Sequence, residues 1–177
     1  MQIRIPQAND SLVLVNEQPP FQPRFRASHI VGFDVLGSVD CIRFDIKGEP
    51  IAQARMRMHH RRRGRTVLYD PSKRLKDLLR NEIRNDLIST DFSDRDFPLF
   101  QDRGGSSPDL SISVKFFIAR DKDLDNMLKA LMDVLQVVVY SDDRKIKKIS
   151  AKKFRANNNN ARLELAIAIA PNDDGDN

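Results

Sequence analysis

The chain has 177 residues, 40% of them hydrophobic and 31% charged, a balance typical of one globular domain with its own core. No apolar run approaches the roughly 20 residues that a membrane-spanning helix requires, so we expect no membrane partner. The single cysteine, Cys41, excludes an internal disulfide and argues against a cysteine-based zinc site. Residues 1–20 lack the pattern of a secretory signal, so we expect an intracellular protein of the cytoplasm or nucleoid.

The net charge of +5 conceals a strongly basic segment between residues 55 and 65, which contains no acidic residue. Its arginines are Arg55, Arg57, Arg61, Arg62, Arg63 and Arg65. Clustered arginines favour a polyanionic partner because each neutralised phosphate releases counterions, so we predict that these six bind DNA. A solvated loop or a targeting patch would have the same composition. His59 and His60 lie in this segment, but histidines in a basic loop are more often solvated than ligating.

The first half of the chain predicts one strand and one helix. Residues 1–37 are weakly patterned and rich in proline, which indicates an N-terminal extension that is at most partly ordered. Residues 42–46 alternate apolar and polar side chains, as a half-buried strand does. Asp70 and Pro71 suit the start of a helix whose apolar stripe runs from Leu75 to Leu87. The other face of this helix would lie along DNA or, as we favour, be solvated; it carries Lys73, Lys76, Arg80 and Arg84.

The second half predicts a loop, a strand, a helix and then a hairpin. Residues 91–109 are rich in turn-forming residues, and residues 110–118 alternate strictly. A helix is expected from about Leu124 to Val137. Two strands, about 147–154 and 163–169, would be joined by a turn at residues 157–160. The order of elements predicts a single α/β domain over residues 38–170, with a mixed β-sheet and packed helices, followed by a flexible acidic tail at 171–177.

Two pairs of aspartates flank the predicted second helix. Asp123 and Asp125 stand where a strand gives way to the helix, and Asp142 and Asp143 follow the helix. We expect one helix and a turn to bring the second pair back beside the first. Clustered carboxylates repel one another unless a cation lies among them, and such hard oxygen ligands suit Mg²⁺ or Mn²⁺. Lys129, one turn after Asp125, could reach back to the carboxylates or to a phosphate.

Each of these residues also has an ordinary structural explanation. Asp123 could cap the helix, Asp125 could favour its dipole, and Asp142 and Asp143 could form a turn. Lys129 could form surface ion pairs along its helix, each worth about 0.2–0.5 kcal/mol. Because all of these explanations would have to coincide, we favour a catalytic site, although acid spacing alone names no substrate.

The same segment resembles the core motif of RusA-type Holliday junction resolvases, D-x-D-N-x-x-K followed by a helical Asp, a D-D pair and a short apolar strand. The matching residues are Asp123-Leu124-Asp125-Asn126-Met127-Leu128-Lys129, Asp133, Tyr140-Ser141-Asp142-Asp143, Ile146 and Ile149. A looser upstream resemblance involves Gly48-Glu49-Pro50, Gln53-Ala54-Arg55 and Tyr69-Asp70-Pro71. The resemblance as a whole covers roughly residues 42–169.

The resemblance implies a RusA-like fold and a homodimeric, Mg²⁺-dependent endodeoxyribonuclease that resolves four-way DNA junctions by paired symmetric nicks in recombination and repair. It assigns metal binding to Asp123, Asp125 and Asp143 and an essential catalytic role to Lys129. Asp142 and Lys122 fall at supporting positions. One alternative is a flap or other branched-DNA nuclease. A second is a non-catalytic junction-binding module, but the intact set of Asp123, Asp125, Lys129 and Asp143 argues against this second alternative.

Overall fold

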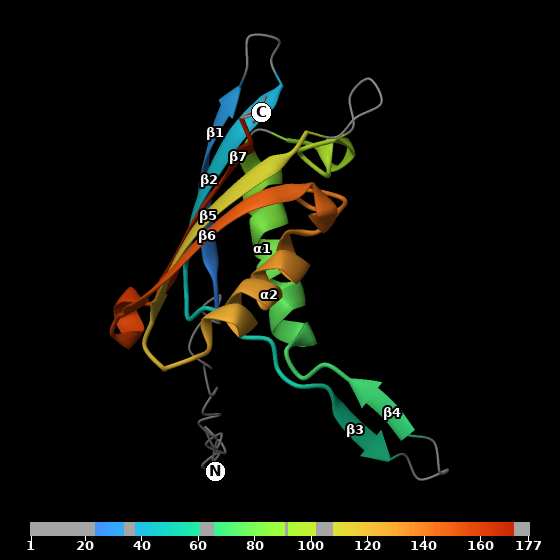
Figure 1. The fold of residues 1–177 in the computed structure, drawn as a ribbon, viewed down its shortest axis with the longest axis vertical. Helices are drawn as coiled ribbons and strands as arrows, with labels where there is room; N and C mark the ends of the chain where they lie inside the picture. Colours follow the sequence, from blue (N-terminus) through green and yellow to red (C-terminus); the bar gives the residue numbers. More distant parts are fainter. Residues whose placement is uncertain (1–23, 34–37, 61–65, 91, 102–107, 172–177) are drawn as a thin grey trace, which may run out of the picture.

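The main element of the fold is a five-stranded mixed sheet with the strand order β1-β2-β7-β5-β6 (Figure 1). The computed structural model describes residues 24–33, 38–60, 66–90, 92–101 and 108–171. The strands are β1 (Arg26–Phe33), β2 (Val39–Lys47), β5 (Leu110–Ile118), β6 (Ile146–Arg155) and β7 (Arg162–Ile169). Within this sheet the β5–β6 pairing is parallel and the pairings β1–β2, β2–β7 and β5–β7 are antiparallel. The predicted α/β class with a mixed sheet is confirmed.

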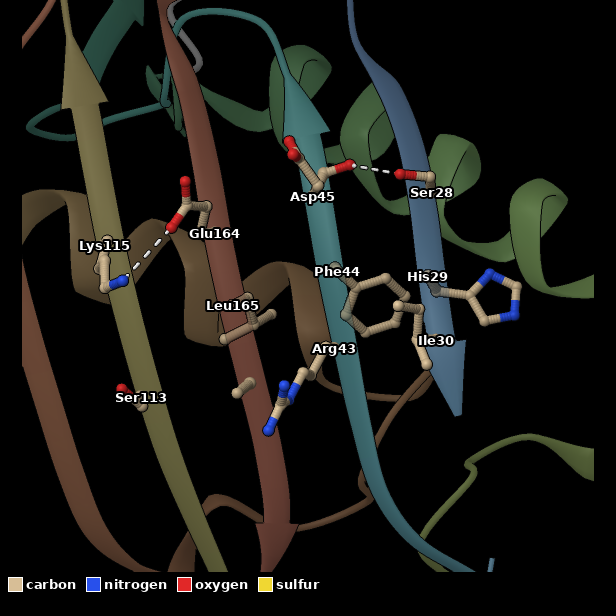
Figure 2. A pocket seen from close by; sticks show the side chains of 11 residues that line it. Ser28, His29, Ile30, Arg43, Phe44, Asp45, Ser113, Lys115, Glu164 and Leu165 are labelled. Atoms are coloured by element: carbon tan, nitrogen blue, oxygen red, sulfur yellow. Dashed lines mark hydrogen bonds and ion pairs between the residues drawn. The ribbon is translucent and has the colours of Figure 1, made fainter. Parts of the chain in front are cut away.

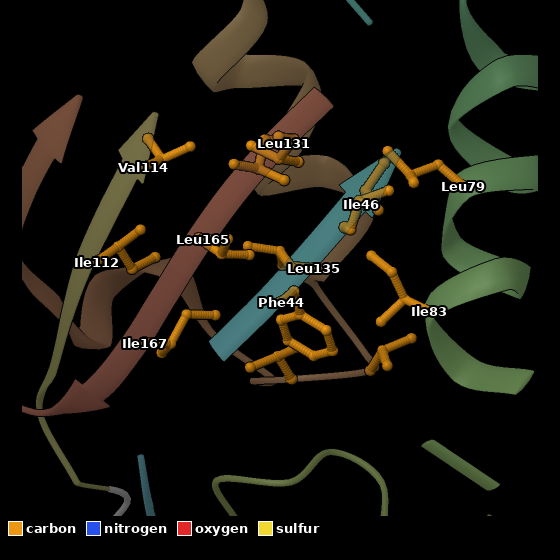
Figure 3. Close-up of a cluster of buried hydrophobic side chains, with 14 of the residues drawn as sticks. Phe44, Ile46, Leu79, Ile83, Ile112, Val114, Leu131, Leu135, Leu165 and Ile167 are labelled. Carbon is orange, nitrogen blue, oxygen red and sulfur yellow. The ribbon is translucent and has the colours of Figure 1, made fainter. Parts of the chain in front are cut away.

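Both helices, α1 (Lys73–Thr90) and α2 (Leu124–Leu135), cover the same face of the sheet (Figure 1). The strict alternation in β2, β5 and β7 sends every second side chain into the core, and Figure 3 shows these residues beneath the helices. The apolar stripe of α1 supplies Leu79, Ile83 and Leu87, each at most 4% exposed. The interface between sheet and helices is therefore the hydrophobic core that the periodicity predicted.

The segment β5–α2–β6 is a parallel crossover, and it determines where the two aspartate pairs lie. Leu110 at the start of β5 is paired with Ile146 at the start of β6, so α2 carries the chain back along the full length of β5. The return is fastened by the Tyr140 hydroxyl, which donates to the Met132 carbonyl oxygen over 3.1 Å. Residues that follow β5 therefore lie at the opposite end of the crossover from residues that precede β6 (Figure 1).

Two sequence-based predictions of strand placement were wrong. Residues 26–33, which we assigned to a weakly ordered extension, form β1 and pair with β2 along its length. The last two strands are not a hairpin, because β7 lies between β2 and β5 whereas β6 lies at the sheet edge. The side chains explain why β7 lies inside the sheet and β6 lies at its edge. β7 buries Leu163, Leu165 and Ile167, whereas β6 carries lysines on both faces and is exposed along most of its length.

The beginning of the basic segment forms a strand that was not among the predicted elements. The strands β3 (Arg57–His60) and β4 (Thr66–Tyr69) pair as a separate two-stranded sheet that projects away from the main sheet (Figure 1). Arg57 and the residues of β4 are exposed. Four of the predicted DNA-binding arginines, Arg61, Arg62, Arg63 and Arg65, lie outside the described residues. Among the described helices, none is long and apolar enough to span a membrane.

Candidate active site

The first aspartate pair stands at the N-terminus of α2, where the chain leaves β5. Asp123 is the N-cap residue by backbone geometry, yet its side chain makes no capping hydrogen bond and instead accepts one from Asn126 Nδ2 over 3.1 Å. Asp125 lies in the first turn, with the Lys129 Nζ 3.4 Å from its Oδ2. The side chains of Asp125 and Lys129 are 67% and 66% exposed. Simple capping therefore does not account for Asp123, and the carboxylate–ammonium pair is open to a ligand.

The loop before Asp123 is held by Glu49, which the sequence analysis did not identify as a site residue. Glu49 Oε1 lies 2.7 Å from Lys122 Nζ, and Glu49 Oε2 accepts a hydrogen bond from the Ala119 N–H over 3.0 Å. Partial burial of Glu49 disfavours its charge, but the Lys122 ammonium and the Ala119 N–H outweigh this and lower the pKa of Glu49. Lys122 is thus engaged in fixing the strand-to-helix loop. The sequence signal was the Gly48-Glu49-Pro50 run within the looser resemblance.

The second aspartate pair begins a short turn that leads into β6. Asp142 accepts hydrogen bonds from the Arg144 N–H over 2.9 Å and from the Arg144 guanidinium over 2.6 Å. The Arg144 side chain and N–H lower the pKa of Asp142 to about 2. Burial of Tyr140, followed by the charges of nearby Asp143 and Asp133, raises the pKa of that tyrosine. Asp142 thus has a structural role at the turn, and Asp143 lies at the C-terminal end of α2.

The expectation that Asp143 returns to Asp123 and Asp125 within one chain is wrong. Asp125 lies in the first turn of α2, and the ten helical residues that follow it span about 15 Å at 1.5 Å per residue before the chain turns toward Asp142 and Asp143. Across the described ranges, no group of three or more His, Cys, Asp or Glu side chains is placed to hold a metal ion. The cause is the parallel crossover, which takes the chain to the far end of β5 before β6 begins. The catalytic and metal-binding roles of these residues stay predictions.

Lys76 of α1 is a second residue that the sequence reasoning missed. We favoured a solvated face for it, yet Lys76 is only 8% exposed. Its Nζ lies 2.5 Å from Asp70 Oδ2 and 2.8 Å from Asp133 Oδ2, and it donates to Gln53 Oε1 over 3.0 Å. Burial opposes its charge, but Asp133 and Asp70 outweigh burial and raise the pKa of Lys76. Lys76 therefore joins the start of α1 to α2, and Asp133 is occupied there.

Arg80, one turn further along α1, is not simply solvated either. Its Nη2 donates to the Asp133 carbonyl oxygen over 2.5 Å and its Nε to the Val134 carbonyl oxygen over 3.3 Å. These carbonyls lie in the last turn of α2, where a cation complements the negative end of the helix. Lys76 and Arg80 thus fix the C-terminal half of α2 against α1, while its N-terminal turn with Asp125 and Lys129 stays exposed.

The comparison with known proteins bears on this same segment. Residues 101–168 match the profile of the family described as Endodeoxyribonuclease RusA. The RusA resemblance is confirmed. The RusA-like segment contains β5, α2 and both aspartate pairs, and it supports Holliday junction nuclease activity in general. The chain is also 28% identical over 130 residues to "Uncharacterized protein YqaN" of Bacillus subtilis (strain 168), covering 66% of this chain and 89% of that relative.

Proposed function

We propose that the protein is a metal-dependent endodeoxyribonuclease that resolves four-way DNA junctions by paired, symmetric nicks. The observation that carries the proposal is the RusA match over the segment in which Asp123, Asp125 and Lys129 lie exposed at the start of α2. The exposed aspartate–lysine arrangement is chemically suited to phosphodiester cleavage, since carboxylates bind cations and an ammonium can offset the charge that develops on a phosphate.

The third carboxylate of the site would come from a second copy of the chain. Asp143 follows α2 and lies near Tyr140 at the C-terminal end of the helix, whereas Asp125 lies in its first turn. In a two-fold dimer each contact occurs twice, so Asp143 of the partner subunit would join Asp123 and Asp125 at two identical sites. A four-way junction offers two symmetric strands, and two identical sites would nick both.

The donor set of such a composite site fits Mg²⁺ or Mn²⁺, since three carboxylates provide hard oxygen ligands. Asp123, Asp125 and Asp143 of the partner subunit would hold the cation, which when bound would activate water and neutralise phosphate charge. Lys129 would place its ammonium at the scissile phosphate. Lys122, held by Glu49 and the Pro50 carbonyl oxygen, would keep Asp123 at the mouth of the site.

A cleavage assay on a synthetic four-way junction tests the proposal. Asp125→Asn should lower the nicking rate in Mg²⁺ by roughly two to three orders of magnitude, comparable to losing one electrostatic stabiliser of a transition state, while junction affinity is kept. Asp94→Asn, which changes an exposed aspartate that pairs with Arg84, serves as the matched control and should cut like wild type. Equal rates for Asp125→Asn and wild type would refute the catalytic assignment.

A panel of substrates separates the proposal from its alternatives. Preference for flaps or splayed arms over four-way junctions would indicate a branched-DNA nuclease of different specificity. Binding of junctions with no cleavage across a titration of Mg²⁺ and Mn²⁺ would indicate a non-catalytic binding module. Symmetric nicks in opposing strands of the four-way junction are the expected result.

A further inference from the structure

The face of the sheet opposite α1 and α2 is strongly basic. Neighbouring strands place side chains in register on this face, so each row crosses the sheet from β6 to β1. The face carries two acids, Asp45 and Glu164, against seven basic residues: Arg26, Arg43, Lys47, Lys115, Lys148, Lys152 and Arg162. Figure 2 shows part of it, where a hollow of 400 Å³ lies over the middle strands.

One of the two acids on this face, Glu164, is neutralised by the basic side chains next to it on the sheet. Glu164 Oε1 lies 2.8 Å from Arg162 Nη2, and Glu164 Oε2 lies 3.5 Å from Lys115 Nζ. The Arg162 guanidinium, followed by Lys115, lowers the pKa of Glu164, so it is charged and paired at neutral pH. The excess positive charge is therefore concentrated along the edge strand β6 and in the last row of the sheet.

That last row also contains a stack of aromatic rings. Phe154 of β6 and Phe117 of β5 are paired in register, with ring centroids 5.1 Å apart and planes inclined by 18°. The Arg162 Cζ lies 3.7 Å from the centroid of Phe117, so Phe117 is covered on both sides. Phe154 ends the stack at the sheet edge and is 40% exposed.

The stack stands at the end of the sheet where β5 leads into the loop before Asp123. A hollow of 120 Å³ adjoins Phe154 and is also lined by Ala119, Asp121, Lys153 and Arg155. Lys153 Nζ lies 2.9 Å from Asp121 Oδ1, which ties β6 to that loop. A ligand that stacks on Phe154 would therefore lie beside the chain that positions the first aspartate pair.

We propose that this edge binds a strand of DNA, with an unpaired base stacked on Phe154 and its backbone phosphates on Lys152 and Lys148. The inference rests on the proposed function for its DNA substrate and adds a recognition site for unpaired nucleotides at a branch. Bases inside a duplex are already stacked, so an exposed ring beside cations selects unpaired ones. Lys148 and Lys152 are about 13 Å apart at 3.3 Å per residue, which matches about four nucleotides of one stacked strand.

A second copy of the chain is the competing occupant, because an edge strand can extend a neighbouring sheet. The charge of β6 favours DNA instead. In ten residues the strand carries five basic side chains and no acid: Lys147, Lys148, Lys152, Lys153 and Arg155. Two such strands side by side would bring like charges together, whereas a phosphate backbone would neutralise them.

The absence of tryptophan from the sequence makes a sharp experiment available. In an Asp125→Asn background that prevents cleavage, Phe154→Trp places a single fluorophore at the end of the stack. Its emission should fall when a splayed-arm DNA with single-stranded tails is added, and should change little with a blunt duplex of the same length. Phe33→Trp, at an exposed position in β1, is the matched control and should report neither DNA.

Affinity measurements complete the test. Phe154→Ala should weaken binding of the splayed-arm DNA by roughly five- to a hundredfold, as loss of one base stack does, and should leave duplex binding unchanged. Lys148→Ala combined with Lys152→Ala should make the salt dependence of single-strand binding shallower by about 1.4 in log–log slope.

The outcomes separate this inference from the proposed function. Unchanged Phe154→Trp emission with every DNA, while the wild-type protein still nicks junctions, would overturn the stacking site and leave the nuclease standing. An emission change that follows protein concentration without DNA would also overturn it, since a second copy would then cover the edge. Quenching by splayed-arm DNA together with no cleavage by wild type would support the site and count against the nuclease.

Discussion

Replacing the buried Lys76 by methionine should destabilise the fold far more than the same exchange at an exposed lysine of α1. The substitution keeps most of the buried aliphatic stem and removes the ammonium that lies between Asp70 and Asp133. Breaking a buried ion pair by removing one partner costs about 3–5 kcal/mol, because the other charge is left unpaired. Asp70 is 13% exposed and would keep its hydrogen bonds from Ser72, whereas Asp133 is 50% exposed and can be hydrated.

The partial hydration of Asp133 reduces the expected loss to about 2–3 kcal/mol in the free energy of unfolding at pH 7. Because the pKa of Lys76 is raised in the folded state, this stabilisation is complete below the unfolded pKa of about 10.4 and is lost as the pH rises through the folded value. The difference between wild type and Lys76→Met should therefore be constant from pH 6 to 9.

Urea denaturation followed by far-ultraviolet circular dichroism measures this difference. Lys73→Met, three residues earlier on α1 at an exposed position, is the control and should change the free energy of unfolding by less than about 0.5 kcal/mol. Adding Asp70→Asn to Lys76→Met should recover part of the loss by removing the unpaired charge. A Lys76→Met protein as stable as the Lys73→Met control would refute the view that this buried ammonium joins the two helices.

Two further predictions concern the loop before the first aspartate pair and the projecting hairpin. Glu49→Gln should lower the free energy of unfolding by about 1 kcal/mol at pH 7, because it weakens the ion pair with Lys122. Since the pKa of Glu49 is lowered in the folded state, this difference between variant and wild type should fade as the pH falls below about 4.3. A difference at pH 3 as large as at pH 7 would contradict the prediction. Arg57→Ala should weaken junction binding uniformly across DNA sequences and make the log–log slope of binding affinity against salt concentration shallower by about 1, as measured by fluorescence anisotropy. An unchanged slope would show that Arg57 of the hairpin does not contact phosphates.

Local patterning predicted most elements of this fold because burial repeats with the period of each element. The alternation in residues 42–46 and 110–118 and the apolar stripe from Leu75 to Leu87 correspond to β2, β5 and α1. Strand order could not be read in the same way, since it depends on pairings between distant segments. The lysines on both faces of residues 146–155 were nevertheless a usable sign of an edge strand.

The sequence predicted where the first aspartate pair and Lys129 lie along the chain's elements, but not how the two aspartate pairs lie relative to each other in space. The D-x-D-N-x-x-K run placed Asp123, Asp125 and Lys129 at the start of a helix, where the structure has them. Asp143 was misplaced because we assumed that a helix and a turn bring the chain back to its starting point. Because β5 and β6 are parallel, the chain has to return to the beginning of β5 before β6 starts, so Asp143 lies at the other end of the sheet from Asp123. The burial of Lys76 could have been predicted from its position, since it lies three residues before Leu79 and seven before Ile83 and so shares their buried face of α1.

Subunit complementation tests the composite site most directly. Asp125→Asn and Asp143→Asn proteins, each inactive alone, are mixed, allowed to exchange subunits and assayed for nicking of a four-way junction. If each site takes Asp125 from one subunit and Asp143 from the other, the mixed dimer has one intact site and should recover single-strand nicking. If the mixture stays as inactive as its components after verified subunit exchange, the carboxylates act within one chain and the composite site is wrong.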